Sequence, residues 1–326
     1  MSTTASEPWI TVLFTPAEQR ALLESEVRAG LTQSPKQLPP KYFYDERGSE
    51  LFDRITRLDA YYPTRTETAI LEAHDAEIAA AVRPQELVEI GSGYSRKTRL
   101  LLETMHAHGG SRYLAFDVSE DAIVAAAGHL GRDYDWLEIE GVVGDFHHHL
   151  PRIPRHGRGL VAFLGSTIGN LHPWERVPFL RDVRDLLREG DRFLLGLDLV
   201  KDVAVLERAY NDPEGVTAEF NMNVLHVLNR ELSADFPVDA FEHRAHYDAD
   251  SGWIEISLVA QRELCVRLET LDLQVHFAPG EAMQTEISCK FTRAGVERAL
   301  GQAGLVLERW FTDSKEAFAL ALAARA

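Results

Sequence analysis

The 326-residue sequence is poor in cysteine and has no long apolar run. Cys265 and Cys289 are its two cysteines, which excludes a disulfide scaffold or a four-cysteine zinc site and suits a reducing cytoplasm. The longest apolar stretches, such as 193–197 and 318–322, fall far short of the ~20 residues that cross a bilayer. Residues 1–9 contain no basic region followed by an apolar core, so we expect no secretory signal.

Positive charge is also scarce. The chain has 34 lysines and arginines against 51 aspartates and glutamates, a formal net charge of −17. Such a chain repels phosphate polyanions unless it has a local basic stripe, and none is visible. There is also no internal repeat and no low-complexity segment. We therefore expect a soluble, monomeric cytoplasmic protein without a nucleic-acid or membrane partner.

The middle of the chain alternates between strand and helix patterns. Strands are expected at residues 86–90, 113–117, just before 144, 159–165 and 192–198, and helices at about 66–82, around 100–102, from 119 and at 173–188. This alternation implies right-handed crossovers and a parallel sheet that helices cover on both faces. The pattern predicts a Rossmann-like, doubly wound α/β domain.

The flanking segments follow other patterns. We expect an amphipathic helix at 16–30 that ends at Gly30, helices and loops at 201–245, long antiparallel strands at 253–290, a helix at 292–302 and a final antiparallel strand pair at 305–311 and 317–321. We therefore predict two domains. A sheet domain comprises residues 66–200 and 289–326, and a smaller α+β domain over the strand ends comprises residues 1–65 and 201–288.

A glycine-rich turn follows the first strand of the predicted sheet. Gly91 and Gly93 let a ligand approach the backbone closely at the edge where open parallel sheets bind ligands. The third glycine of the dinucleotide pattern would stand at Arg96, so the turn does not match a pyrophosphate site. Asp117 ends the second strand, where its carboxylate can accept both ribose hydroxyls or cap the next helix.

The end of the third strand adds a further element to this edge. Asp145 and Phe146 offer an amide and a ring fit to hold adenine. Together with the glycine turn, they favour an adenosine ligand without a pyrophosphate. The three histidines at 147–149 invite a metal site, but on an extended chain they would point to alternating sides, and no second cluster is evident. We therefore predict no metal.

This set of features resembles the class I S-adenosylmethionine (SAM)-dependent methyltransferases, whose turn signature is acidic-x-Gly-x-Gly. From about residue 35 to the end, the chain is similar to a narrower family, the L-histidine Nα-methyltransferases of ergothioneine biosynthesis. The segments that carry this similarity are residues 41–56, 61–67, 89–98, 165–170 and 285–288. The nucleic-acid amino-methyltransferases of similar fold carry Asn/Asp-Pro-Pro-Tyr after strand four, where this chain has Ser166 to Asn170.

The resemblance implies an activity and a set of site residues. The activity is the trimethylation of the α-amine of L-histidine to hercynine by SAM, without a metal. Residues implied to contact SAM are Tyr44, Gly91, Lys97, Asp117, Asp145 and Phe146. Residues implied to hold histidine are Tyr61, Asn170, Tyr210, Glu286 and Ser288. Tyr44 and Asn170 are the candidate catalytic residues.

The residue types are compatible with these roles, although each has a plainer explanation. Glu286 and Ser288 lie two apart on a predicted strand and so share a face, where they can grip both imidazole nitrogens or form an ordinary solvent face. Asn170 can bond the substrate's carboxylate or amine, or form an Asx turn. Tyr61 and Tyr210 can donate to the carboxylate or serve in packing.

Two features of the chemistry stay open. The α-ammonium must lose a proton before methyl transfer, and a tyrosine, Asn170 through a water, or bulk solvent can accept it. Ile256 stands in the expected pocket wall where some members have a flexible methionine, so the pocket's shape can differ.

Two other functions are compatible with these residues. An N-methyltransferase for another small amine or amino acid would share every cofactor residue. A SAM sensor without turnover would share the binding residues.

Overall fold

The computed structural model describes residues 9–95 and 97–326, which fold into two compact units. The first unit runs to Phe14 and includes Pro63–Val200 and Lys290–Ala326, and the second comprises Thr15–Tyr62 and Lys201–Cys289. The expectation about a secretory signal rests on residues 1–9, of which 1–8 are not described, and the expectation about a third glycine concerns Arg96. Arg96 likewise lies outside the described residues.

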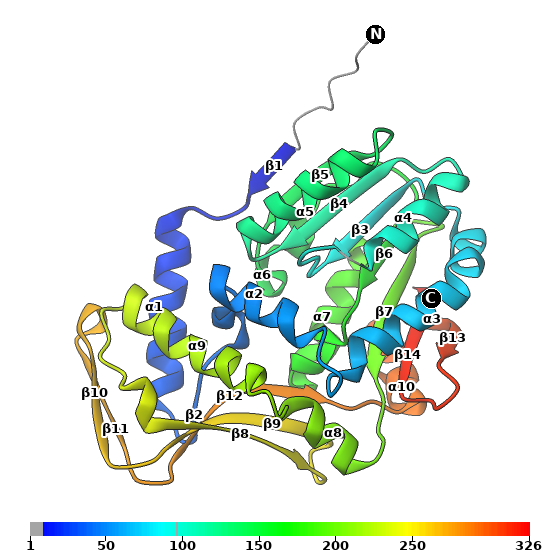
Figure 1. The fold of residues 1–326 in the computed structure, drawn as a ribbon. Helices are drawn as coiled ribbons and strands as arrows, with labels where there is room; N and C mark the ends of the chain where they lie inside the picture. The colour runs from blue at the N-terminus through cyan, green and yellow to red at the C-terminus, as the bar shows by residue number, and fades with distance from the viewer. Residues whose placement is uncertain (1–8, 96) are drawn as a thin grey trace. The chain divides into compact units, whose positions relative to one another are not determined.

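The first unit is built on a sheet whose strand order is β1-β5-β4-β3-β6-β7-β14-β13 (Figure 1). Its strands are β1 (Trp9–Val12), β3 (Glu86–Ile90), β4 (Arg112–Asp117), β5 (Glu138–Val143), β6 (Gly159–Phe163), β7 (Arg192–Asp198), β13 (Leu305–Thr312) and β14 (Phe318–Arg325). The strands from β1 to β7 in this order pair in parallel, whereas β14 is antiparallel to both β7 and β13. The predicted parallel α/β sheet and its terminal antiparallel pair are confirmed.

Helices cover both faces of this sheet. They are α3 (Tyr62–Val82), α4 (Thr98–Ala107), α5 (Glu120–Asp133), α7 (Pro173–Leu186) and α10 (Arg293–Ala303). Leu194 of β7 belongs to a core that includes residues of α3, α4 and α5. Its neighbour Leu195 contacts the same space as residues of α7 and α10. Because successive strand residues point to opposite faces, the sheet is doubly wound, as predicted.

The second unit joins helices to smaller sheets. Its strands are β2 (Lys36–Gln37), β8 (Phe241–Asp248), β9 (Trp253–Ala260), β12 (Ala282–Cys289) and the hairpin of β10 (Leu264–Leu268) and β11 (Leu273–Phe277). Its helices are α1 (Pro16–Thr32), α2 (Glu46–Ile55), α8 (Val203–Tyr210) and α9 (Val216–Glu231). The four-stranded sheet has the order β2-β12-β9-β8. A buried core that includes Phe43, Phe220 and Phe277 joins most of these elements, whereas α8 packs in a separate cluster with Ile254 and Ile256 of β9.

Several local expectations differ from the structure. Helix α1 continues to Thr32 and does not end at Gly30. A Cβ atom at Gly30 would lie 2.1 Å from the carbonyl oxygen of Gln37, so this glycine permits the close approach of β2 and is not a cap. Helix α3 begins four residues earlier than expected, at Tyr62. Strand β8 begins at Phe241, within the segment expected to hold only helices and loops.

Two differences concern the first unit. Strand β1 was not expected, and it pairs in parallel with β5 at the sheet edge, so residues 9–14 belong to this unit. The three histidines at 147–149 form part of a short helix, α6 (Phe146–His149), and are not extended.

No helix in the described part of the chain is long and apolar enough to cross a membrane.

Candidate active site

The glycine turn of the first unit has the backbone that only glycine adopts freely. Gly91 and Gly93 have φ angles of +68° and +48°. A Cβ atom at Gly91 would meet the Phe163 ring at 3.7 Å. The Gly93 N–H donates a 2.8 Å hydrogen bond to the carboxylate of Asp117, whose other oxygen accepts from Ser119 N at 3.0 Å. The turn after β3 and the end of β4 are therefore fixed to each other.

The carboxyl group of Asp117 has a raised pKa. Burial raises the pKa of Asp117 above its usual value, and the N–H donors of Ser119 and Gly93 oppose that rise. Helix α5 is capped by the side chain of Ser119, which accepts from Ala122 N at 3.3 Å. Because Ser119 supplies the cap, Asp117 is not needed for it, and its carboxylate stands at the strand end where ribose hydroxyls are held in folds of this kind.

Asp145 and Phe146 lie at the end of the neighbouring strand β5. Asp145 caps α6 and is buried, and one of its carboxylate oxygens lies 2.9 Å from both the backbone nitrogen and Nδ1 of His147. The Phe146 ring packs edge-on against Phe163 of β6, with a centroid separation of 5.6 Å. The sheet thus brings the predicted adenosine-contacting residues to the carboxyl ends of adjacent parallel strands.

Lys97 immediately precedes helix α4, and its ammonium group pairs with the carboxylate of Glu67, a residue that was not among the predicted site residues. Its ammonium group forms an ion pair with Glu67 of α3, a residue with no exposed surface. Glu67 also accepts hydrogen bonds from the Gly165 N–H, which lies 2.8 and 3.0 Å from its two oxygens. Glu67 falls within the 61–67 motif, and this was the one feature of the sequence that could have marked it as a site residue.

A second buried carboxylate lies on the same face of the sheet. One oxygen of Glu89 accepts from Thr98 at 2.6 Å and from the Tyr113 hydroxyl at 2.7 Å. Burial raises the pKa of Glu89 to about 7, although these two hydrogen bonds lower it in part. The Tyr113 hydroxyl also contacts Ser95 at 2.6 Å. This cluster ties Ser95, just after the glycine turn, and Thr98, the first residue of α4, to β3 and β4.

Asn170 ends a short 3-10 turn, Thr167–Asn170, that follows β6. Ser166 at the start of this turn has a φ of +59°, a left-handed conformation that serine rarely adopts. Its hydroxyl accepts a 2.9 Å hydrogen bond from the backbone N–H of Asp198. Asp198 in turn forms a 2.9 Å ion pair with Lys290, and both side chains are buried. The turn that carries Asn170 is therefore anchored to β7.

The second unit brings together the residues predicted to hold histidine. The Tyr210 hydroxyl lies 2.7 Å from the Ser288 hydroxyl. Glu286 is directly opposite Ile256 in the β12–β9 ladder, and Ser288 is opposite Ile254. Ile254 and Ile256 share a buried cluster with Tyr210, against which Tyr61 packs. Because paired residues of an antiparallel ladder share a face, Glu286 and Ser288 lie on the same side as these tyrosines.

Tyr44 lies in an aromatic group of the second unit. Its ring packs edge-on against Phe52 and Phe220, with centroid separations of 5.7 and 5.4 Å. Phe52 in turn lies edge-on to Tyr61 at 6.5 Å, and Tyr61 to Tyr210 at 6.1 Å. A continuous row of rings therefore joins Tyr44 to the tyrosines predicted to hold the substrate. Such faces suit a positively charged ammonium group.

A buried polar network behind this face was missed. A bulge at Thr285 shifts the ladder, and the Thr285 hydroxyl donates to Asn221 at 2.7 Å. The Asn221 amide contacts His243 Nδ1 at 2.9 Å, and His243 Nε2 lies 2.9 Å from the carbonyl oxygen of Tyr210. Burial lowers the pKa of His243. Nothing in the sequence marks Asn221, because its environment depends on chain segments far apart.

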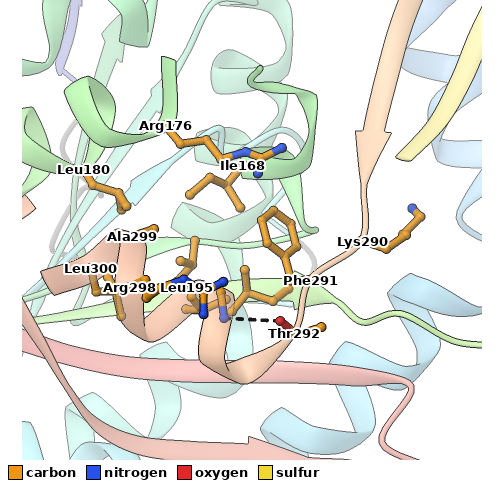
Figure 2. Close-up of a pocket in the computed structure, with 13 residues that line it drawn as sticks. Ile168, Arg176, Leu180, Leu195, Lys290, Phe291, Thr292, Arg298, Ala299 and Leu300 are labelled. Atoms are coloured by element: carbon orange, nitrogen blue, oxygen red, sulfur yellow. Dashed lines mark hydrogen bonds between the residues drawn. The ribbon is translucent and has the colours of Figure 1, made fainter. Parts of the chain in front are cut away.

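A cavity of about 270 Å³ lies elsewhere in the first unit, between α7, α10 and β7 (Figure 2). Ile168, Leu195 and Val296 line it, and the Arg176 guanidinium at its edge lies 5.1 Å from the centre of the Phe291 ring. None of the site residues predicted from the sequence lines this cavity. Within residues 9–95 and 97–326, no group of three or more His, Cys, Asp or Glu side chains is placed to hold a metal.

Comparisons with known proteins identify the family of this chain. Residues 23–325 match the family model described as "Histidine-specific methyltransferase, SAM-dependent". The histidine N-alpha-methyltransferase of Mycolicibacterium smegmatis is 54% identical over 93% of this chain and 95% of its own length, and that of Mycobacterium tuberculosis is 53% identical over the same shares. Ergothioneine biosynthesis protein 1 of Neurospora crassa is 31% identical over 83% of this chain and 31% of its own length. The chain therefore belongs to the family of histidine-specific, SAM-dependent methyltransferases.

Proposed function

We propose that this enzyme transfers three methyl groups in succession from SAM to the α-amine of L-histidine, producing hercynine in the first step of ergothioneine biosynthesis. The observation that carries the proposal is the 54% identity to a histidine N-alpha-methyltransferase over nearly the whole of both chains. The stoichiometry is three SAM to three S-adenosylhomocysteine, and three protons leave the α-ammonium group. The product keeps one positive charge, on its quaternary nitrogen.

The residues of the first unit fit the methyl donor. When bound, SAM supplies an electrophilic methyl group on a sulfonium. Gly91 and Gly93 shape the turn, a Cβ atom at Gly93 would meet nothing within 4 Å, and Asp117 presents a carboxylate to ribose hydroxyls beside the turn. Asp145 and Phe146 hold the adenine, and the Lys97 ammonium faces the donor's own carboxylate. No metal is needed, because the sulfonium is already a good leaving group.

The residues that the family resemblance assigns to histidine have side chains suited to the acceptor. Glu286 and Ser288 hold the two imidazole nitrogens from one face of β12. Tyr61, Tyr210 and Asn170 bond the α-carboxylate and α-amine, and Tyr44 supplies an aromatic face for the growing cation. These residues catalyse the reaction mainly by holding the nitrogen in line with the methyl group, at a near-attack separation of roughly 3 to 3.5 Å.

The test is mass spectrometry of a reaction with purified protein, SAM and a mixture of all twenty amino acids. We expect mass gains of one, two and three methyl groups on histidine alone. Methylation of a different amino acid would support the roles proposed for the donor-binding residues but contradict those proposed for the acceptor-binding residues. Cofactor binding without any methylated product would instead indicate a SAM sensor.

We also propose that the enzyme works as a cytoplasmic monomer without nucleic acid. The net charge of −17 and the two cysteines support this proposal. Light scattering coupled to size exclusion should then give a mass near 36.6 kDa. A mass of twice that value, at the concentrations used for activity, would contradict the monomer.

A further inference from the structure

Gly196 lies in the middle of β7, a buried strand in which a side chain is normally present. A Cβ atom at Gly196 would lie 2.1 Å from a carboxylate oxygen of Glu67 and 3.2 Å from the backbone nitrogen of Gly165. A glycine inside a strand often marks a place where another group approaches the backbone closely. Here the missing side chain makes room for the Glu67 carboxylate against the sheet.

A buried carboxylate is costly unless it is paired and hydrogen-bonded. The partners of Glu67 are the Lys97 ammonium and the Gly165 N–H. The Lys97 side chain keeps 20% of its surface exposed, whereas Glu67 keeps none. Part of the Lys97 side chain is therefore open to solvent, while the carboxylate that its ammonium group contacts is fully enclosed.

The two partners of Glu67 stand at two functionally distinct turns of the first unit. Lys97 lies just beyond the glycine turn, at the residue that precedes α4. Gly165, with a φ of +75°, opens the turn that ends at Asn170. One carboxylate thus connects the turn proposed to bind the donor with the turn proposed to bind the acceptor.

We propose that Glu67 is a positioning residue that holds the Lys97 ammonium against the donor's carboxylate and fixes the turn carrying Asn170, and that Gly196 is required to admit it. This inference rests on the proposed function, because it uses the proposed roles of Lys97 and Asn170. Glu67 itself touches neither substrate. It acts through the charge it presents to Lys97 and the bonds it accepts from Gly165.

The decisive experiment is a double-mutant cycle on SAM binding. Glu67→Gln keeps an acceptor for the Gly165 N–H but loses the negative charge beside Lys97, so the Kd for SAM, measured by calorimetry without histidine, should rise about tenfold. Lys97→Met should weaken SAM binding as well. Adding Glu67→Gln to Lys97→Met should then cause no further loss, because the ion pair is already gone. Additive losses would overturn the proposal.

Glycine variants give a second, independent measurement. Gly196→Ala should reproduce the loss of SAM affinity by displacing the Glu67 carboxylate. Gly301→Ala is the matched control, because a Cβ atom there meets nothing within 4 Å. If Gly196→Ala fails to fold, the Glu67→Gln cycle still decides the question. A Glu67→Gln protein with a lowered melting temperature and unchanged SAM affinity would show a structural role alone and overturn the inference.

These readouts separate the inference from the proposed function. Binding of SAM is measured without any methyl acceptor, so a non-additive cycle supports the role of Glu67 even if histidine is not the substrate. Conversely, normal histidine trimethylation by the parent enzyme together with unaltered SAM binding by Glu67→Gln would leave the proposed function intact and overturn the positioning role.

Discussion

The phenolic oxygen of Tyr210 lies 2.7 Å from the hydroxyl oxygen of Ser288, and both side chains are buried. This contact joins the end of α8 to β12 across 78 residues of sequence. Removing either hydroxyl disturbs the orientation of the other. Tyr210→Phe and Ser288→Ala should therefore each raise the KM for histidine, and the double variant should cost little more than either alone. Steady-state kinetics with SAM saturating measures this, and independent, additive effects would contradict a shared role.

Glu286 should determine the choice of substrate. A site built to hydrogen-bond an imidazole leaves polar groups poorly matched when the carboxylate is lost. Glu286→Ala should therefore lower kcat/KM for histidine by roughly tenfold or more, while the KM for SAM changes little. Glu255→Ala is the matched control, because Glu255 lies on the neighbouring strand, next to Ile256, and points to the opposite face. Unchanged histidine kinetics in Glu286→Ala would refute the assignment.

Glu89 should make stability fall as the pH rises. Its pKa is about 7 in the folded protein against 4.5 in the unfolded chain. Between these values the folded state keeps a proton that the unfolded state has lost, so the free energy of unfolding decreases through this window and the loss is complete above about pH 7. The shift corresponds to about 3 kcal/mol.

Glu89→Gln isolates this contribution. Its amide oxygen can still accept from Thr98 and Tyr113, which both reach one oxygen of Glu89. Urea unfolding from pH 5 to 8 should show the variant gaining stability relative to the parent as the pH rises. Glu263→Gln, at an exposed turn, serves as the control. A constant difference between Glu89→Gln and the parent at every pH would contradict the shift.

The polar network behind the tyrosines should affect histidine and not SAM. Asn221→Leu removes the nearer of the two acceptors of the Thr285 hydroxyl and the partner of His243 Nδ1. Unmet buried polar groups cost ~1–3 kcal/mol, so the melting temperature should fall. We also expect the KM for histidine to rise, because His243 holds the Tyr210 backbone and Thr285 forms the bulge beside Glu286. A fall in stability with both KM values unchanged would show that the network has no role in the site.

Breaking the ion pair between Asp198 and Lys290 on one side should destabilise the fold strongly. Both side chains are buried, and their charged atoms are 2.9 Å apart. Lys290→Met leaves the Asp198 carboxylate without this cation, which should cost about 3–5 kcal/mol of unfolding free energy. Asp198→Asn combined with Lys290→Met should recover part of that loss. Denaturant unfolding of the two variants checks this, and equal stabilities would contradict it.

Much of the fold follows from local sequence patterns. The alternation of apolar strands with helices between residues 86 and 198 predicts the parallel sheet, because periodicity and glycine turns depend on neighbouring residues. The start of α5 likewise follows from its cap at Ser119. Strand β1 could not be predicted in this way, since four residues become a strand only when they pair with β5.

In the candidate site, too, some features could be predicted from the sequence and others could not. Sequence motifs identified the residue types at Asp117, Asn170, Glu286 and Ser288, since the chemistry of carboxylates, amides and hydroxyls belongs to single side chains. Motifs also carried the family resemblance, which the comparisons confirmed. The roles proposed for individual residues remain predictions that the variants above test.

The sequence by itself determined the parallel sheet, its glycine turn and the family. Tertiary structure alone decided that Gly196 faces Glu67, that Asn221 meets Thr285 and His243, and that Tyr210 reaches Ser288. The reason is physical. Periodicity and turn chemistry act over a few residues, whereas the burial that raises the pKa of Glu89 and the pairing of buried charges depend on segments brought together only by packing.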